Sequence, residues 1–104
     1  MWAQLIKVRL KSGNDGAISR LYQELQATEQ PGSGLVQTMA LQDQKDPSVH
    51  YLFASFESEA VARQREQDPR RQEALAPVRK MMEEIFEGPP EFIDLNVIEQ
   101  NLPS

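Results

Sequence analysis

The sequence of 104 residues contains no cysteine. This absence excludes disulfide bonds, thiolate metal sites, iron–sulfur clusters and a cysteine nucleophile. Positive charge is also scarce, since eleven lysines and arginines stand against sixteen acidic residues and leave a net charge of -5. Such a chain is poorly suited to binding a phosphate backbone, so we expect no nucleic acid partner.

Membrane spans and cofactor motifs are also missing. No apolar run approaches the roughly 20 residues that cross a bilayer, and the N-terminus lacks the basic and apolar segments of a signal peptide. The five glycines do not have the spacing of phosphate-binding loops. A single histidine cannot build a histidine-rich metal site. We therefore expect a cytoplasmic protein without a membrane partner, a cofactor or a metal.

The composition that remains is that of a folded domain. Hydrophobic residues make up 39% of the chain and charged residues 26%, which separates it from disordered sequences. The length matches one hydrophobic core. We expect a single domain over residues 1–100 and a polar tail over residues 101–104.

Hydrophobic periodicity predicts the order strand, helix, strand, strand, helix, strand. Alternation with period two marks the strands, and apolar residues three and four apart mark the helices. The predicted strands are residues 2–10, 35–42, 49–56 and 92–99, with helical segments after Gly16, from Ser58 to about Gln67, and from Pro69 to Gly88. This order predicts an α+β ferredoxin-like βαββαβ domain with an antiparallel sheet.

Several strands carry apolar residues on both faces, although helices cover only one face of such a sheet. In the third strand, Tyr51 and Phe53 alternate with Leu52 and Phe56. Burying both faces in so short a chain is most simply achieved by pairing two sheets face to face. We therefore expect a homodimer that pairs through the sheet faces.

The order of elements, Asp46-Pro47 before the third strand, residues 49–56 running into 57–60, and Pro69 at the next helix carry a resemblance. On these features, residues 2–99 resemble the antibiotic biosynthesis monooxygenase family of dimeric α/β barrels. The resemblance implies that fold and a cofactor-independent oxygenation of an aromatic, polyketide-like small molecule. It leaves open the other activities found on the same scaffold.

Three positions depart from the pattern of that family. Phe56 stands where many members have a tryptophan at the end of the third strand, and Arg65 and Arg70 stand where members commonly have histidines. A guanidinium stays protonated near neutral pH and does not act as a base. A mechanism that depends on histidine at those two positions is therefore not expected here.

The candidate catalytic residues are His50, Tyr51 and Tyr22. His50 is the one side chain whose ordinary pKa suits proton transfer near pH 7, although it could equally be a core or edge residue. The tyrosines could donate a hydrogen bond to a bound carbonyl or simply pack. Because side chains alternate along a strand, only one of His50 and Tyr51 can point between the sheet and the helices.

A second set of residues predicts an aromatic pocket. The set consists of Phe53, Phe56, Arg65, Met82 and Phe86, and ordinary core packing is the alternative for its apolar members. The arginines at 63, 65, 70 and 71 could bind a carboxylate or phosphate, or form a solvated surface with the acidic residues between them.

Two functions follow. The first is a monooxygenase that binds and deprotonates a phenolic aromatic molecule and uses the electrons of that substrate. The second is a non-catalytic dimeric module that binds a small ligand or a partner protein on the same fold.

Overall fold

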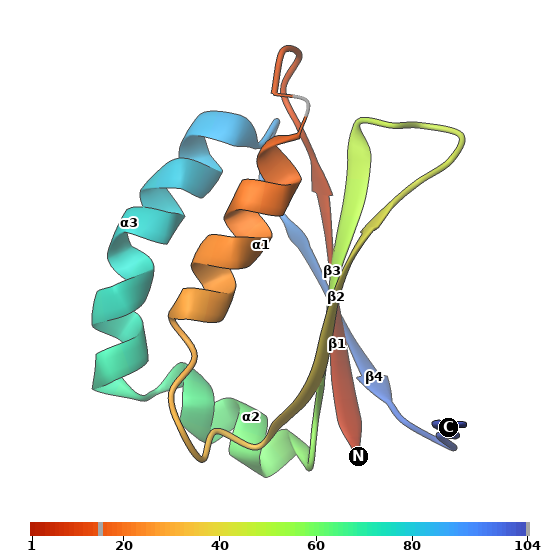
Figure 1. Cartoon of the computed structure of the whole chain (residues 1–104), viewed down its shortest axis with the longest axis vertical. Coiled ribbons are helices and arrows are strands. Elements are labelled where there is room, and N and C mark those ends of the chain that lie inside the picture. Colours follow the sequence, from red (N-terminus) through yellow and green to blue (C-terminus); the bar gives the residue numbers. More distant parts are fainter. Residues whose placement is uncertain (15, 104) are drawn as a thin grey trace.

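A computed structural model describes residues 1–14 and 16–103 (Figure 1). The described residues form a four-stranded antiparallel sheet, in the order β2-β3-β1-β4, with helices on one face. The elements are β1 (Trp2–Arg9), α1 (Ala17–Ala27), β2 (Leu35–Gln42), β3 (Val49–Phe56), α2 (Glu59–Glu66), α3 (Pro69–Ile85) and β4 (Glu91–Asn96). This arrangement confirms the ferredoxin-like fold, in the form βαββααβ.

The register of the sheet assigns each strand residue to one of two faces. Ile6 lies opposite Leu52, and Leu5 lies opposite Phe53 and Ile93. Neighbours across an antiparallel pair share a face. Ile6 and Leu52 share one face and pack in one cluster with residues of α1 and α3. This face, called the inner face, is therefore turned toward the helices. The outer face bears Leu5, Met39, Leu41, Tyr51, Phe53, Ile93 and Leu95.

Capping residues start the second and third helices where the sequence predicts. The Ser58 hydroxyl accepts a hydrogen bond from the Val61 N–H at the start of α2. The Asp68 carboxylate accepts one from the Arg70 N–H, and Pro69 is the first residue of α3. These contacts satisfy amide groups that the first turn of a helix leaves unpaired.

One proline lies inside a helix, and one strand boundary differs from the expectation. Pro77 lies inside a continuous α3. It and Glu73 are exposed, so the Glu73 carbonyl, which has no Pro77 N–H to accept from, can bond to water. The last strand ends at Asn96, not at residue 99. Asn96 already faces Trp2, the first residue of β1, and the Val97 N–H then bonds to the Met1 carbonyl at 3.2 Å.

Two apolar clusters hold the helices against the inner face. One cluster joins Leu10, Leu21, Leu52, Val78 and Ile85 to their neighbours near one end of the sheet. The other cluster consists of Trp2, Phe56 and Ala62 near the other end, with the Trp2 and Phe56 rings 5.9 Å apart. The space between the clusters is not completely filled, and the candidate site lies there.

Candidate functional site

A cavity of about 660 Å³ lies between the inner face of the sheet and helices α1 and α3. Its volume is within the range of small-molecule sites, roughly 300–1,000 Å³. Much of its wall is apolar and is formed by Ile6, Leu52, Leu75, Met82, Phe86 and Phe92. The cavity can therefore accept the body of an aromatic or other apolar molecule.

The five residues predicted to form a pocket are all part of this lining: Phe53, Phe56, Arg65, Met82 and Phe86. Phe53 contributes from β3, where alternation turns its side chain to the outer face. Phe56 is buried at the polar end of the cavity, with the Arg65 guanidinium 5.1 Å from the centre of its ring. This distance is within the range of a cation–π contact.

Tyr22 is the predicted catalytic residue that lines the cavity. Helix α1 directs its phenol toward β2, where its hydroxyl lies 2.7 Å from the Thr38 hydroxyl. Gln26, one turn later, donates a hydrogen bond to the Tyr22 oxygen at 3.3 Å. The Tyr22 hydroxyl also donates to the Thr38 carbonyl at 3.3 Å. Donation to an oxygen atom of a ligand would replace that hydrogen bond.

His50 and Tyr51 are not part of the cavity lining, and their side chains lie on opposite faces of β3. His50 lies opposite Val8 on the inner face, is only 5% exposed, and has its Nδ1 atom 3.4 Å from the Ser48 carbonyl. Tyr51 lies opposite Lys7 on the outer face. The structure therefore brings neither side chain to Tyr22, and their catalytic roles stay predictions.

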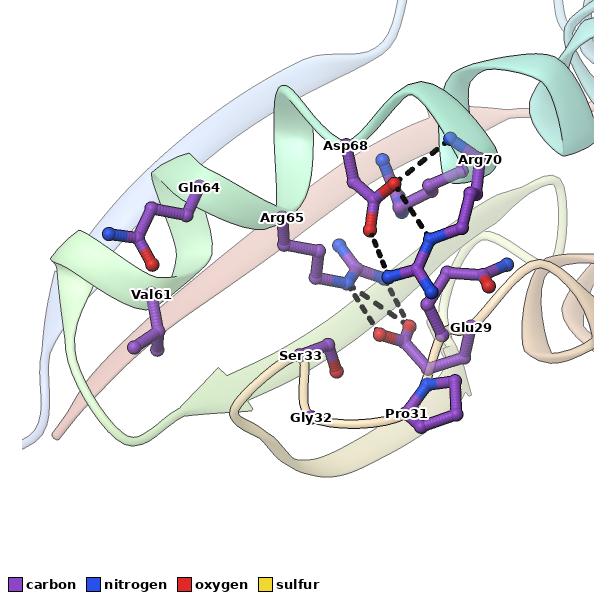
Figure 2. A pocket seen from close by; sticks show the side chains of 11 residues that line it. Glu29, Pro31, Gly32, Ser33, Val61, Gln64, Arg65, Asp68 and Arg70 are labelled. Atoms are coloured by element: carbon purple, nitrogen blue, oxygen red, sulfur yellow. Dashed lines mark hydrogen bonds and ion pairs between the residues drawn. The ribbon is translucent and has the colours of Figure 1, made fainter.

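The polar end of the large cavity adjoins a smaller hollow of about 200 Å³ (Figure 2). Glu29 and Arg65 line both spaces and form an ion pair, with Arg65 Nη2 and Nε at 2.6 Å and 2.9 Å from the two carboxylate oxygens. Burial raises the pKa of Glu29, but hydrogen bonds from Arg65 and Ser33 and the positive charges of Arg65 and Arg71 outweigh it. The net effect lowers that pKa below its usual 4.5.

Arg71 also lines both spaces, but its environment differs from that of Arg65. Its Nε atom is buried and has no hydrogen-bond partner among the residues that the structure describes. Burial is the main cause that lowers the pKa of Arg71 to about 10, and the neighbouring charge of Arg65 adds to the effect. Arg71 nonetheless remains charged at neutral pH.

The other two arginines of the predicted cluster are paired at the surface. Arg63 bonds to the carboxylates of Glu59, Glu66 and Asp94, and Arg70 bonds to that of Asp68 (Figure 2). The cluster thus divides into a self-neutralising surface, as one of the two interpretations predicted, and two arginines that reach the cavity.

Sequence reasoning did not single out the stripe of α3 that faces the cavity. Arg71, Leu75, Arg79 and Met82 follow one another at intervals of four, four and three residues and all line it, the spacing of one helix face. That periodicity was readable in the sequence. Glu29 carried no comparable signal, because its partner Arg65 is 36 positions away.

Two further observations concern metal ligation and membrane spans. Within residues 1–14 and 16–103, histidine and acidic side chains form no cluster of three that could hold a metal ion. Over the same residues, the helices are too short or too polar to cross a bilayer.

Comparison with known proteins identifies this architecture. No family model and no curated protein matches the sequence. Solved structures match over nearly the whole chain. A protein of unknown function from Nitrosomonas europaea is 18% identical with a TM-score of 0.75, and the match covers 99% of this chain and 94% of that one. A candidate antibiotic biosynthesis monooxygenase from the same organism is 14% identical with a TM-score of 0.73, covering 95% and 100%.

A third structure, a candidate antibiotic biosynthesis monooxygenase from Chloroflexus aurantiacus, is 22% identical with a TM-score of 0.68 and coverage of 97% of both chains. The chain therefore has the fold of the antibiotic biosynthesis monooxygenases, as its sequence predicted. Identities at this level establish the fold, and one fold hosts many reactions.

Proposed function

We propose that the protein binds a small aromatic molecule in the large cavity and oxidises it with molecular oxygen, as a cofactor-independent monooxygenase. The observation that supports this function best is the cavity itself, with about 660 Å³ of space, apolar walls and a tyrosine hydroxyl at its edge. The neighbouring structures described as monooxygenases of this fold point in the same direction.

The proposed reaction takes its electrons from the substrate. An anthrone-like CH₂ group loses two hydrogens, one atom of O₂ becomes the new carbonyl oxygen, and the other atom leaves in water. The protein must hold the ring away from bulk water and stabilise the oxygen that gains negative charge. Tyr22 is the lining residue that we assign to the second task, because its hydroxyl can donate a hydrogen bond to a ligand in place of its bond to Thr38.

A non-catalytic ligand-binding module is the second candidate function. The observation that favours it is that His50, the predicted base, lies outside the cavity lining, with its Nδ1 near the Ser48 carbonyl. Binding would then use the same apolar walls without turnover.

We also propose that two copies pair through the outer face. Leu41 and Leu95 on that face are 42% and 40% exposed, and Leu5, Phe53 and Ile93 lie between them in the register. An apolar face of this kind is typical of a protein interface, and a two-fold axis would let one sheet cover the other. Light scattering at micromolar concentration should give twice the monomer mass of 11.8 kDa.

Oxygen uptake by the purified protein with anthrone-like and hydroquinone substrates tests the catalytic proposal. We expect uptake that follows product formation, and a loss of about 100-fold in Tyr22→Phe, the size of effect seen when one oxyanion donor is removed. Tyr51→Phe is the matched control, because it removes the same hydroxyl from the outer face. His50→Ala tests the predicted base.

The results separate the two functions. Uptake that Tyr22→Phe leaves unchanged would contradict the role of Tyr22. Binding of the same compounds without uptake above the uncatalysed rate would favour the ligand-binding module.

A further inference from the structure

The charged groups around the large cavity are not balanced among themselves. Glu29 is fully engaged by Arg65, which contacts both of its carboxylate oxygens. Glu66 is paired with Arg63, at 3.3 Å, on the surface. Among the described residues, neither carboxylate of the lining is hydrogen-bonded to Arg71.

Arg79, the other arginine of the lining, has a polar partner. Its Nη2 atom donates a hydrogen bond to the Gln72 side-chain oxygen at 2.7 Å, and its residue is exposed. Arg71 is half-buried by contrast, and its Nε–H has no acceptor in the part of the chain that the structure describes. Arg71 is thus the cavity cation that most lacks a counterpart.

An unpaired donor on a buried cation is costly, because the group has lost hydration without gaining a partner. The lowered pKa of Arg71 reflects the same burial. An anion in the cavity would place an opposite charge beside the Arg71 guanidinium, which lines the cavity and to which no carboxylate of the lining is hydrogen-bonded in the described residues. The planar guanidinium matches the two oxygens of a carboxylate and forms strong charge-assisted hydrogen bonds with them.

The position of Arg71 indicates how a ligand would lie in the cavity. On the same face of α3, Leu75 follows one turn later and Met82 three turns later, and both line the apolar part of the cavity. A molecule held at one end by Arg71 would therefore lay its body along an apolar wall. The lining carries three arginines and two glutamates, a net charge of +1 that suits a monoanion better than a phosphate dianion.

We propose that the ligand of the large cavity is an aromatic carboxylic acid and that Arg71 binds its carboxylate. This inference rests on the proposed function, since it names the class of molecule that occupies the same cavity. Arg71 acts here as a residue of binding and specificity, and it fixes which end of the ligand enters toward Glu29 and Arg65.

Two probes with one ring system test the inference: anthracene-9-carboxylate and 9-anthracenemethanol, followed by anthracene fluorescence. For the wild-type protein we expect the acid to bind about ten times more tightly than the alcohol. Arg71→Gln should bring the two affinities to within about twofold by weakening the acid alone. Raising the salt concentration should reduce the preference of the wild-type protein.

Arg70→Gln is the matched control. It removes the same charge from the neighbouring position, but the Arg70 side chain is 65% exposed and bonds to Asp68 outside the large cavity. We expect it to keep the tenfold preference. Arg71→Lys keeps the charge without the planar fork and should retain part of it.

Each probe reports on a different claim. Binding of the alcohol tests whether an apolar ligand occupies the cavity, and the ratio of acid to alcohol tests the role of Arg71. Equal binding of both probes by the wild-type protein, or a preference that survives in Arg71→Gln, would overturn the inference and leave the proposed function standing. Binding of neither probe would overturn both.

Folding of the variant is checked by its thermal unfolding. Because no carboxylate is hydrogen-bonded to Arg71 in the described residues, and burial of its charge offsets its attraction to Glu29, Arg71→Gln should unfold near the wild-type Tm. If the variant were to unfold, the comparison of Arg71→Lys with Arg70→Gln still decides the question: an unchanged preference in Arg71→Lys and a lost preference in Arg70→Gln would contradict the inference.

Discussion

The two faces of the sheet are built from the same strands but meet different surroundings. On the inner face, helices α1 and α3 pack over the strands (Figure 1), and Leu21 of α1 is completely buried. On the outer face, Leu41 and Leu95 remain largely exposed. Both faces carry apolar side chains because the strands place hydrophobic residues at alternating and also at adjacent positions, so that some point to each face. The comparison teaches that one chain of this length can cover one face and also leave room for a cavity there.

The largest effect is expected on the outer face. Leu41→Glu places a charge in the proposed interface twice, once from each copy, and burying an unpaired carboxylate costs several kcal/mol. We expect the variant to be a monomer of about 11.8 kDa by light scattering with the secondary structure of the wild type. An assembly with the same mass as the wild type would contradict pairing through the outer face.

A matched pair of truncations compares the faces directly. Leu21→Ala should lower the free energy of unfolding by about 2–5 kcal/mol, because it opens a cavity in a packed core. Leu41→Ala, at 42% exposure, should change it by less than about 0.5 kcal/mol under conditions that keep the chain monomeric. Urea unfolding of both variants measures the difference, and equal losses would contradict it.

The close contact between Gly34 and Val61 of α2 tests how tightly the helical side of the sheet is packed. The φ of +80° at Gly34 disfavours a side chain, and an added Cβ would lie 2.5 Å from Val61 Cγ2, so Gly34→Ala should cost about 1–3 kcal/mol. Gly32→Ala is the control, because its φ is +75° but no atom lies within 4 Å of the added Cβ. Thermal unfolding should show the larger loss for Gly34→Ala.

The smallest effect concerns the ion pair between Glu29 and Arg65. Because folding lowers the pKa of Glu29 below 4.5, the pair stabilises the protein above about pH 4.5 and loses this contribution as the pH falls through the lowered pKa. Glu29→Gln should cost about 1 kcal/mol at pH 7 and lessen the loss of stability on acidification. Glu59→Gln, which breaks an exposed pair with Arg63, should cost less than about 0.5 kcal/mol.

The fold was largely predictable because local signals agreed with one another. Alternation marked the strands, and Ser58 and Asp68-Pro69 marked the starts of two helices. The end of the last strand was not predictable in the same way. It depends on where β1 begins to pair, which is a property of two segments about ninety positions apart.

The candidate site was predictable in its apolar part and less so in its polar part. Phe56, Met82 and Phe86 have the spacing of core residues, and residues of that kind also line a cavity that the core leaves open. Whether an arginine is paired depends on contacts distant in sequence, such as that of Arg65 with Glu29. The contrast between Arg65 and Arg71 therefore required the structure.

The contact between Val97 and Met1 has a consequence for the topology of the chain. Since β1 and β4 are neighbours and antiparallel, the start of the first strand and the end of the last strand lie side by side at the same end of the sheet. A short peptide could therefore link these two ends of the chain. With new termini opened in the exposed turn between β2 and β3, the rearranged chain should still fold. Such a circular permutant would leave every wall of the cavity in place.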